Sequence, residues 1–450
     1  MPHLVPHSQV LKMERFIYDF LVLKVDFWGK MALKDIIISS LTKAEDSMKI
    51  ARKSAEYLRT RYGINMPDVS QTIHPGDFSG GEFNPEVLCD LKGKHVFLFA
   101  VPTDPANILN NVSPGEMKSR AEFAANAAKE WGAAHVTLVA TDLYFSRADK
   151  GPEDFSEKSD DEKKKLFKGK GNLARAQAKA FMSNGIDRVL TLHLHSGHVQ
   201  ESYGKIYGRG DVLMDLSPVP LLIHYLTHYS NVGLNKNNGS NIVLLLSDLG
   251  AKPIGDYLYD SLHRLGYTGI SKIQFSKTRK VANDPNKVEI YNPQVSPNYT
   301  GLEGKTALTI DDMDDTAGTR KATCVTIKED GIEIEGFGRQ RPANIVIYGT
   351  HAVHAGLNFE SAMQTIAAAE PSEVIYTNSH PSIERNMTYY LKKVTSVIRT
   401  AHFFGEVIRC LEEEIPIGES YTTNGILDMA KISKFAVQPF RRSEHMNNLR

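Results

Sequence analysis

The densest group of potentially reactive side chains lies in Thr309–Arg320, TIDDMDDTAGTR. An apolar strand is expected before this segment and a helix after it. The turn should therefore present free backbone N–H groups at a helix N-terminus, where anions such as phosphate bind. Thr316 and Thr319 add hydroxyl donors, whereas the aspartates would repel phosphate alone and suit sugar hydroxyls or a magnesium ion. A helix cap needs one aspartate and not four in five positions, so we interpret the segment as a sugar-phosphate site.

A second candidate segment is basic. Ser276–Asn283, SKTRKVAN, follows a short apolar run, and its Lys277 and Arg279 lie two residues apart. Alternate residues of an extended chain point the same way, so this pair could hold a polyphosphate. Taken alone, a solvated basic loop is the better interpretation.

A third candidate segment contains alternating histidines after another apolar run. In Leu192–Gln200, LHLHSGHVQ, His193, His195 and His198 could together form a transition-metal site, because imidazole nitrogens are common ligands of such ions. The residues alone do not decide between that site and a single histidine that serves a magnesium–nucleotide complex.

The elements that must position these segments are short apolar runs alternating with longer amphipathic stretches. Strands that are apolar throughout and followed by helices predict parallel sheets covered on both faces. The expected strands are His95–Val101, Val136–Ala140, Val189–Leu194, Ile242–Leu246, Ala307–Ile310, Ile345–Tyr348 and Val374–Tyr376. The expected helices are Ala44–Tyr62, Met117–Trp131, Asn172–Asn184, Ile254–Leu265, Thr319–Glu329 and Asn358–Ala369.

This pattern predicts an α/β protein with two similar domains. Residues 1–70 are expected to form a helical N-terminal extension, 71–212 the first α/β domain and 213–412 the second, with 413–450 as a tail. The first domain contains an insertion at 149–170, which is rich in both signs of charge and poor in apolar residues. Such a composition indicates a solvated surface segment.

Composition excludes several classes of protein. Lys plus Arg and Asp plus Glu both total 53 among 450 residues, so no global charge favours nucleic acid or anionic membranes. The apolar stretch Phe16–Leu41 is interrupted by charges and does not fit a membrane span. An odd number of widely spaced cysteines fits no disulfide framework and favours a cytoplasmic location. These cysteines are Cys89, Cys324 and Cys410.

The sugar-phosphate segment, DDMDDTAGT, resembles the phosphoribosyl pyrophosphate (PRPP) binding loop DDxxDTxGT of type I phosphoribosyltransferase folds. The resemblance implies two phosphoribosyltransferase-like domains and a bound ribose phosphate. That loop occurs in enzymes that consume PRPP and in those that make it. The sugar-phosphate residues it implies are Asp311, Asp312, Asp315, Thr316, Ala317, Gly318 and Thr319.

The basic and histidine segments indicate which reaction is involved. SKTRKVAN resembles the KxRKxAN catalytic loop of ribose-phosphate pyrophosphokinases, which gives Lys277 and Arg279 a transition-state role. LHLHSGHVQ is similar to the DLHxxQxQ element of that family, in which His195 matches the histidine that binds magnesium with ATP. This resemblance ranks the magnesium interpretation above a transition-metal site, although His193 replaces an aspartate and His198 a glutamine.

Three further segments resemble the same family. FSGGEFNPE is similar to a segment that holds adenine in the neighbouring subunit, which implies ATP contacts from Phe78 and Glu82. YFSRADK is similar to YxRQDK and implies ATP contacts from Arg147 and Asp149. SDLGAK is similar to DxGGAK with one residue deleted and implies that Asp248 faces a metal ion. THAVHAG and TNSHP look like segments that close the second domain.

Together these resemblances imply a Mg²⁺-dependent transfer of the diphosphoryl group of ATP to the anomeric hydroxyl of ribose 5-phosphate, in a homo-oligomer. Two alternatives remain. Departures at Gly80, Ala148, His193 and 247–252 would suit an inactive regulatory paralogue. The additions at 1–70 and 149–170 would suit a larger acceptor such as ADP-ribose. A phosphoribosyltransferase fits less well, because it needs no ATP-side domain.

Overall fold

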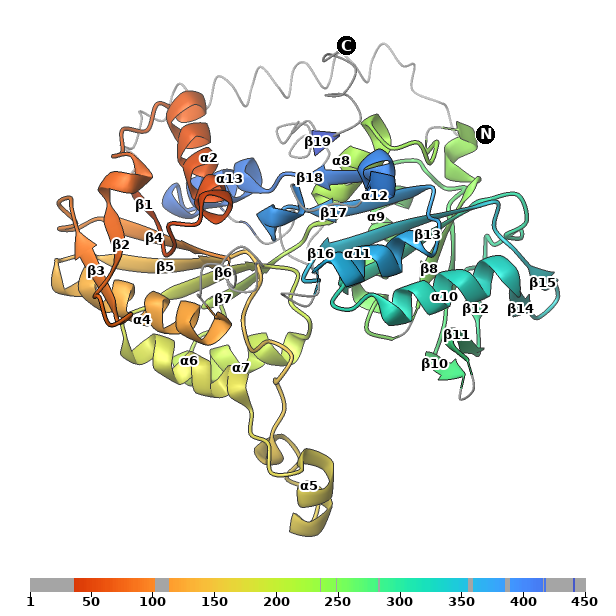
Figure 1. The fold of residues 1–450 in the computed structure, drawn as a ribbon, viewed down its shortest axis with the longest axis horizontal. Coiled ribbons are helices and arrows are strands. Elements are labelled where there is room, and N and C mark those ends of the chain that lie inside the picture. The colour runs from red at the N-terminus through yellow and green to blue at the C-terminus, as the bar shows by residue number, and fades with distance from the viewer. Residues whose placement is uncertain are drawn as a thin grey trace, which may run out of the picture.

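The computed structural model describes residues 36–101, 113–234, 236–247, 249–281, 284–354, 359–384, 389–415, 417 and 440–441. These residues form two lobes, each built on a mainly parallel sheet with helices packed against it (Figure 1). No helix within the described ranges is long and apolar enough to cross a membrane. Among the described residues, Cys89, Cys324 and Cys410 form no disulfide.

The sheet of the first lobe has five parallel strands in the order β1-β4-β5-β6-β7. Their bounds are β1 Ile36–Ser40, β4 His95–Ala100, β5 His135–Ala140, β6 Arg188–Leu192 and β7 Leu213–Leu216. The helices of this part of the chain are α2 Glu45–Tyr62, α4 Pro114–Glu130, α5 Asp160–Phe167, α6 Leu173–Ser183 and α7 Gly197–Tyr207.

The sheet of the second lobe has eight strands in the order β12-β9-β8-β13-β16-β17-β18-β19, parallel except for the two edge strands β12 and β19. Their bounds are β8 Ile242–Leu246, β9 Ser271–Gln274, β12 Gln294–Val295, β13 Thr306–Met313, β16 Asn344–His351, β17 Glu373–Thr377, β18 Thr395–Ile398 and β19 Phe440–Arg441. The later helices are α8 Val219–His228, α9 Lys252–Arg264, α10 Gly318–Glu329, α11 Phe359–Ala367, α12 Tyr389–Val394 and α13 Ala401–Glu412.

Both sheets are buried on both faces, which explains their uninterrupted apolar sequences. In β4, every residue from His95 to Ala100 is buried. Alternate residues of this strand belong to different clusters: Phe97 packs in the cluster that contains α2 and α13, and Leu98 in the one that contains α4 and α6. The predicted fold class, with parallel sheets covered by helices, is therefore confirmed.

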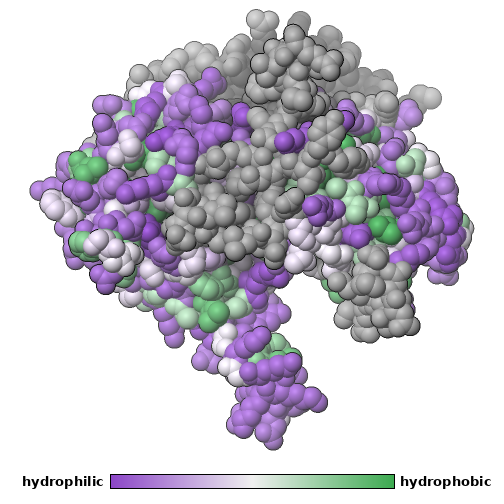
Figure 2. All heavy atoms as spheres, viewed as in Figure 1, coloured by the Kyte–Doolittle hydropathy of each residue, from purple (hydrophilic) through white to green (hydrophobic). Residues whose placement is uncertain are grey.

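Three two-stranded hairpins lie outside the main sheets. One joins β2 Ile73–Asp77 to β3 Phe83–Val87, another joins β10 Lys277–Val281 to β11 Asp284–Tyr291, and the third joins β14 Ile332–Ile334 to β15 Gly338–Gln340. The predicted insertion contains α5, which projects from the first lobe and is largely hydrophilic (Figure 2). No residue from 152 to 173 is buried, as its charge-rich composition predicted.

The structure corrects three domain assignments. The segment 1–70 is not wholly helical, because β1 (36–40) pairs with β4 inside the first sheet; residues 1–35 lie outside the described ranges. The seam does not fall at residue 212, because β7 pairs with β6. Helix α13, which falls within the predicted second domain, packs on the first lobe: it contacts α2, and its Phe404 ring lies 6.1 Å from the Phe99 ring of β4. Within the segment predicted as the tail, β19 pairs with β18.

Candidate active site at the interface of the lobes

The sugar-phosphate segment begins at the carboxyl end of β13 and leads into α10. Strand β13 lies at the centre of its sheet, between β8 and β16, where the ends of parallel strands usually form ligand sites. The residue before α10, Ala317, has a left-handed backbone with φ of 58° and is buried. A non-glycine residue in that conformation is strained, and such strain is concentrated at functional turns.

The four aspartates of this segment divide into two groups. Asp314 is buried and accepts hydrogen bonds from Arg320 Nε at 3.0 Å and from the Tyr376 hydroxyl at 2.8 Å. Arg320 also lies 3.4 Å from a carboxylate oxygen of Asp311. Burial alone would lower the pKa of the Arg320 guanidinium, but Asp314 and Asp311 outweigh that effect and raise it. Asp311, which is predicted to bind the sugar, therefore also contacts the arginine of the buried Asp314–Arg320 pair.

The other two aspartates contact the first lobe. Asp312 lies 2.7 Å from His195 Nδ1, and Asp315 lies 3.0 Å from Arg147 Nη1. His195 and Arg147 are 44% and 60% exposed, whereas their partners Asp312 and Asp315 are 17% and 35% exposed, so solvent reaches each pair mainly from the first lobe's side chain. We call these two contacts the cross-lobe pairs. They bring two residues predicted to bind ATP directly to the segment predicted to bind the sugar phosphate.

In the first cross-lobe pair, the contact between His195 and Asp312 favours the charged form of both side chains. The hydrogen bond to Asp312 raises the pKa of His195 against the opposing effect of burial. Burial would raise the pKa of Asp312, yet the hydrogen bond from His195 and the neighbouring histidines hold it below its usual range. The aspartate is therefore ionised at neutral pH and can accept hydrogen bonds or bind a cation.

The three alternating histidines have different partners. His193 is buried with a positive φ of 51°, and its Nδ1 lies 2.6 Å from the Thr350 hydroxyl oxygen. Burial lowers the pKa of His193 to about 4. His195 contacts Asp312, whereas His198 lies 3.5 Å from Glu201 on its own helix. Among the described residues, these three histidines therefore do not form a group that could hold one metal ion.

Other residues predicted to contribute are dispersed. Phe78 and Glu82 are exposed at the tip of the β2–β3 hairpin, where the Phe78 amide donates to the Glu82 carbonyl. Asp149 lines a cavity of about 700 Å³ between the insertion and helices α6 and α7. Lys277 and Arg279 lie on β10, where only the backbone is described. Asp248 lies outside the described residues.

A smaller cavity of about 270 Å³ adjoins the cross-lobe pairs. It is bounded by the segment from Asp142 to Ala148 after β5, by Met313 at the end of β13 and by Val353. Arg147 is among its lining residues. Both lobes thus contribute walls to one hollow beside the residues predicted to bind ATP and sugar phosphate.

The sequence reasoning missed the buried scaffold of this site. Asp314 and Arg320 stand inside the recognised segment but were given no role, and Thr350 and Tyr376 were not singled out. One signal was available: in a segment entering a buried turn, four aspartates cannot all face solvent. An arginine five or six residues later is a natural partner for those that do not.

No family model matches the chain, but known proteins do. It is 25% identical over 308 residues to a ribose-phosphate pyrophosphokinase of Neisseria meningitidis, covering 68% of this chain and 75% of the relative. It is 24% identical over 387 residues to one from Prochlorococcus marinus, covering 85% and 93%. The chain is thus similar over most of its length to curated ribose-phosphate pyrophosphokinases.

One solved structure has the same fold as this chain. Phosphoribosylpyrophosphate synthetase from Mycobacterium smegmatis superposes with a TM-score of 0.58 and 19% identity, covering 85% of this chain and all of that one. The likeness extends over both lobes and agrees with the two phosphoribosyltransferase-like domains expected from the sequence.

Proposed function

We propose that this chain transfers the diphosphoryl group of ATP to the anomeric hydroxyl of ribose 5-phosphate, giving PRPP and AMP. The cross-lobe pairs are the observation that carries the proposal. Two residues assigned to ATP, His195 and Arg147, meet two assigned to the sugar phosphate, Asp312 and Asp315, at 2.7 and 3.0 Å. Two substrates bound by these residues would have their reacting groups side by side, which the transfer requires.

Each residue then has a part in the reaction. The turn from Asp315 to Thr319, at the start of α10, would bind the 5-phosphate through backbone N–H groups and hydroxyls. Asp312 would accept hydrogen bonds from the ribose hydroxyls in place of its present contact with His195. The anomeric oxygen forms a bond to the β-phosphorus, the bond from that phosphorus to the α–β bridging oxygen breaks, and AMP leaves. Lys277 and Arg279 would stabilise the charge that develops.

Magnesium fits the residues at this site. Mg²⁺ prefers oxygen ligands and uses one or two carboxylates with substrate phosphates, and the ionised Asp312 provides such a carboxylate beside His195. The ion would neutralise charge on the transferred phosphates. We further propose a homo-oligomer, in which the exposed Phe78 and Glu82 reach the ATP of a neighbouring subunit.

The proposal is tested by incubating the chain with ATP and Mg²⁺ and following AMP and PRPP. AMP should appear only when ribose 5-phosphate is present. ADP-ribose as a competing acceptor, with mass spectrometry of the products, tests the larger-acceptor alternative. AMP formation that does not depend on any acceptor would contradict the proposal, and no turnover at all would favour the regulatory paralogue.

Catalysis by the β10 loop has its own test. Lys277→Ala should lower turnover by roughly 100-fold or more while leaving the melting temperature unchanged, because the lysine would act on transition-state charge. Lys287→Ala is the matched control: this lysine lies on the adjacent strand β11 and pairs with Asp330 at 2.8 Å. Equal rates for the two variants would remove Lys277 from the catalytic assignment.

A further inference from the structure

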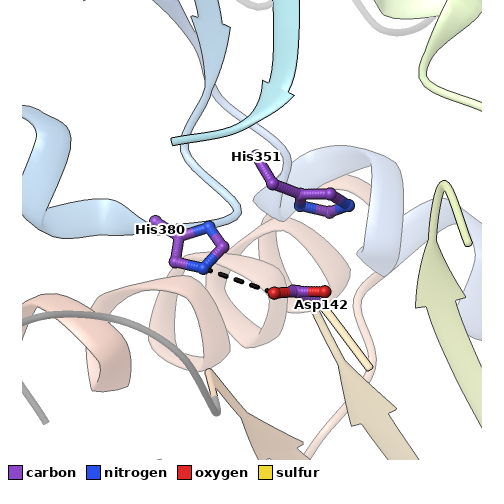
Figure 3. A group of neighbouring side chains, drawn as sticks. All are labelled: Asp142, His351 and His380. Atoms are coloured by element: carbon purple, nitrogen blue, oxygen red, sulfur yellow. Dashed lines mark ion pairs between the residues drawn. The ribbon is translucent and has the colours of Figure 1, made fainter. Parts of the chain in front are cut away.

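A second group of metal-ligand side chains lies at the lobe interface and shares no residue with those assigned to magnesium. Asp142 follows β5 of the first sheet, His351 ends β16, and His380 follows β17 of the second sheet. One potential ligand atom from each lies within 4.8 Å of those of the other two. Figure 3 shows the three side chains directed toward one another, and all are buried, with Asp142 only 6% exposed.

The distances within this group suit a metal ion better than a direct hydrogen bond. His380 Nε2 and Asp142 Oδ2 are 3.5 Å apart, beyond the usual length of an N–H···O bond. Two ligands bound tetrahedrally to zinc, at 2.0–2.2 Å each, are separated by roughly 3.3–3.5 Å. The two imidazoles and one carboxylate are also a ligand set that zinc accepts.

The hydrogen bonds around the group indicate which ring nitrogen of His351 carries the proton and which is left with a lone pair for a metal ion. Its Nε2 lies 3.2 Å from the His193 carbonyl oxygen, which can only accept, so Nε2 carries the proton. In the neutral imidazole Nδ1 then holds the lone pair. The Ser379 hydroxyl lies 2.9 Å from Nδ1 but also 3.2 Å from the Thr350 carbonyl, to which it can donate instead.

His380 has a comparable environment. Its Nδ1 lies 3.3 Å from the same Ser379 hydroxyl, while Nε2 is the nitrogen nearer Asp142. Metal-binding histidines usually engage their second ring nitrogen with a neighbouring oxygen, which fixes the ring orientation. Both histidines of this group meet that condition.

We propose that Asp142, His351 and His380 bind one divalent transition-metal ion, with zinc the best match, and that this ion fastens the first lobe to the second. The site is structural, and its three ligands are not among the residues assigned to the diphosphoryl transfer. It also reaches the candidate active site, because His351 donates to the carbonyl of His193, two residues before His195. A bound ion would therefore hold the chain segment that presents His195 as well as the lobe interface.

The first experiment measures metal content. The full chain, purified without a histidine tag, should contain about one zinc per chain by mass spectrometry, and cobalt substitution should give the visible spectrum of a low-symmetry Co²⁺ site. Asp142→Asn and His380→Gln should each weaken zinc binding by more than about 100-fold, beyond the loss typical of outer contacts. His402→Gln is the control, because this imidazole stacks on Tyr57 with ring centroids 4.8 Å apart, away from the group.

Results that would overturn the site are a native chain that takes up no zinc or cobalt, or ligand variants that bind as much as His402→Gln. If the variants do not fold, the native chain still decides. A chelator should lower its melting temperature, and added zinc should restore it. An unchanged melting temperature after metal removal would show that the group is a polar network without an ion.

Discussion

The two sides of the segment Thr309–Arg320 use the same residue type for different purposes. On the buried side, Asp314 is tied to Arg320, and both side chains are at most 5% exposed. On the other side, the aspartates are partly buried, Asp312 at 17% and Asp315 at 35% exposed, and they reach His195 and Arg147 of the other lobe, which are 44% and 60% exposed. The buried pair fixes the turn within its own lobe, whereas the cross-lobe pairs join residues that substrates would contact.

Solvent explains this difference. A buried pair cannot lose one partner without leaving an uncompensated charge in the interior, so its geometry is fixed. An exposed pair contributes little to stability, because water solvates both charges almost as well. The cross-lobe pairs can therefore be exchanged for contacts with a ligand at little cost, while the turn that carries them stays in place.

The largest effect on stability is expected at the buried pair. Arg320→Met should lower the free energy of unfolding by about 3–5 kcal/mol, because Asp314 and Asp311 lose their shared cation. Urea denaturation followed by circular dichroism measures it. Arg339→Met is the control: its pair with Glu333 is more than half exposed, and the change should stay within about 1 kcal/mol. Equal losses in the two variants would contradict a scaffold role.

The reverse pattern is expected at the cross-lobe pairs. Asp312→Asn should lower turnover by roughly 100-fold through lost contacts with substrate, while the free energy of unfolding falls by less than in Asp314→Asn, because the partner His195 remains solvated. Asp314→Asn is the matched comparison and should mainly reduce stability. Steady-state AMP release and urea denaturation of both variants test the distinction. It fails if the two substitutions reduce stability to the same extent.

A smaller effect is expected at the start of α10. Thr316→Ala removes one exposed hydroxyl from the turn and should weaken ribose 5-phosphate binding by about tenfold, the value of one hydrogen bond to a charged group. ATP affinity should change by less than about twofold, since the hydroxyl lies on the acceptor side. Calorimetric titration of each ligand measures both. An equal loss of the two affinities would argue against separate acceptor and ATP sites.

The smallest effect concerns pH. His195 has a raised pKa in the folded chain, so its contribution is fully present below 6.5 and is lost as the pH rises through the folded value. Asp312 has a lowered pKa, so its contribution is present above 3.8 and is lost as the pH falls through the folded value. His195→Asn should therefore reduce stability slightly near pH 5.5 and not near pH 8.5, by under about 1 kcal/mol.

This pH prediction has an internal control. In the Asp312→Asn background, His195→Asn should have the same effect at both pH values, because the carboxylate that raises the pKa of His195 is gone. A pH dependence that persists in this background would assign it to another group.

Much of the fold could be predicted from the sequence. The apolar runs placed β8 at its observed bounds and β4, β5, β13, β16 and β17 within a few residues, because strands buried on both faces are apolar throughout. The prediction missed β1, whose three isoleucines end the apolar stretch Phe16–Leu41, and β7, whose sequence LMDL is short. Both are strands because neighbouring strands provide hydrogen bonds, which a local pattern does not report.

The candidate site was predictable to a similar degree. The sequence located the turn before α10, and its dense aspartates marked it as a candidate site. It could not distinguish Asp314, which faces inward, from Asp312 and Asp315, which face the other lobe. One strand end can place neighbouring side chains on opposite sides, and only packing decides which side becomes the interior.

By itself, the sequence determined the alternation of strands and helices, the family resemblance and the chemistry available in each segment, since these depend on residue types and spacing along the chain. The tertiary structure decided which segments meet. It brought α13 back to the first lobe, paired His195 with Asp312, and gathered Asp142, His351 and His380 from three strand ends. Contacts between residues more than a hundred positions apart depend on how two sheets pack, and no local pattern records that packing.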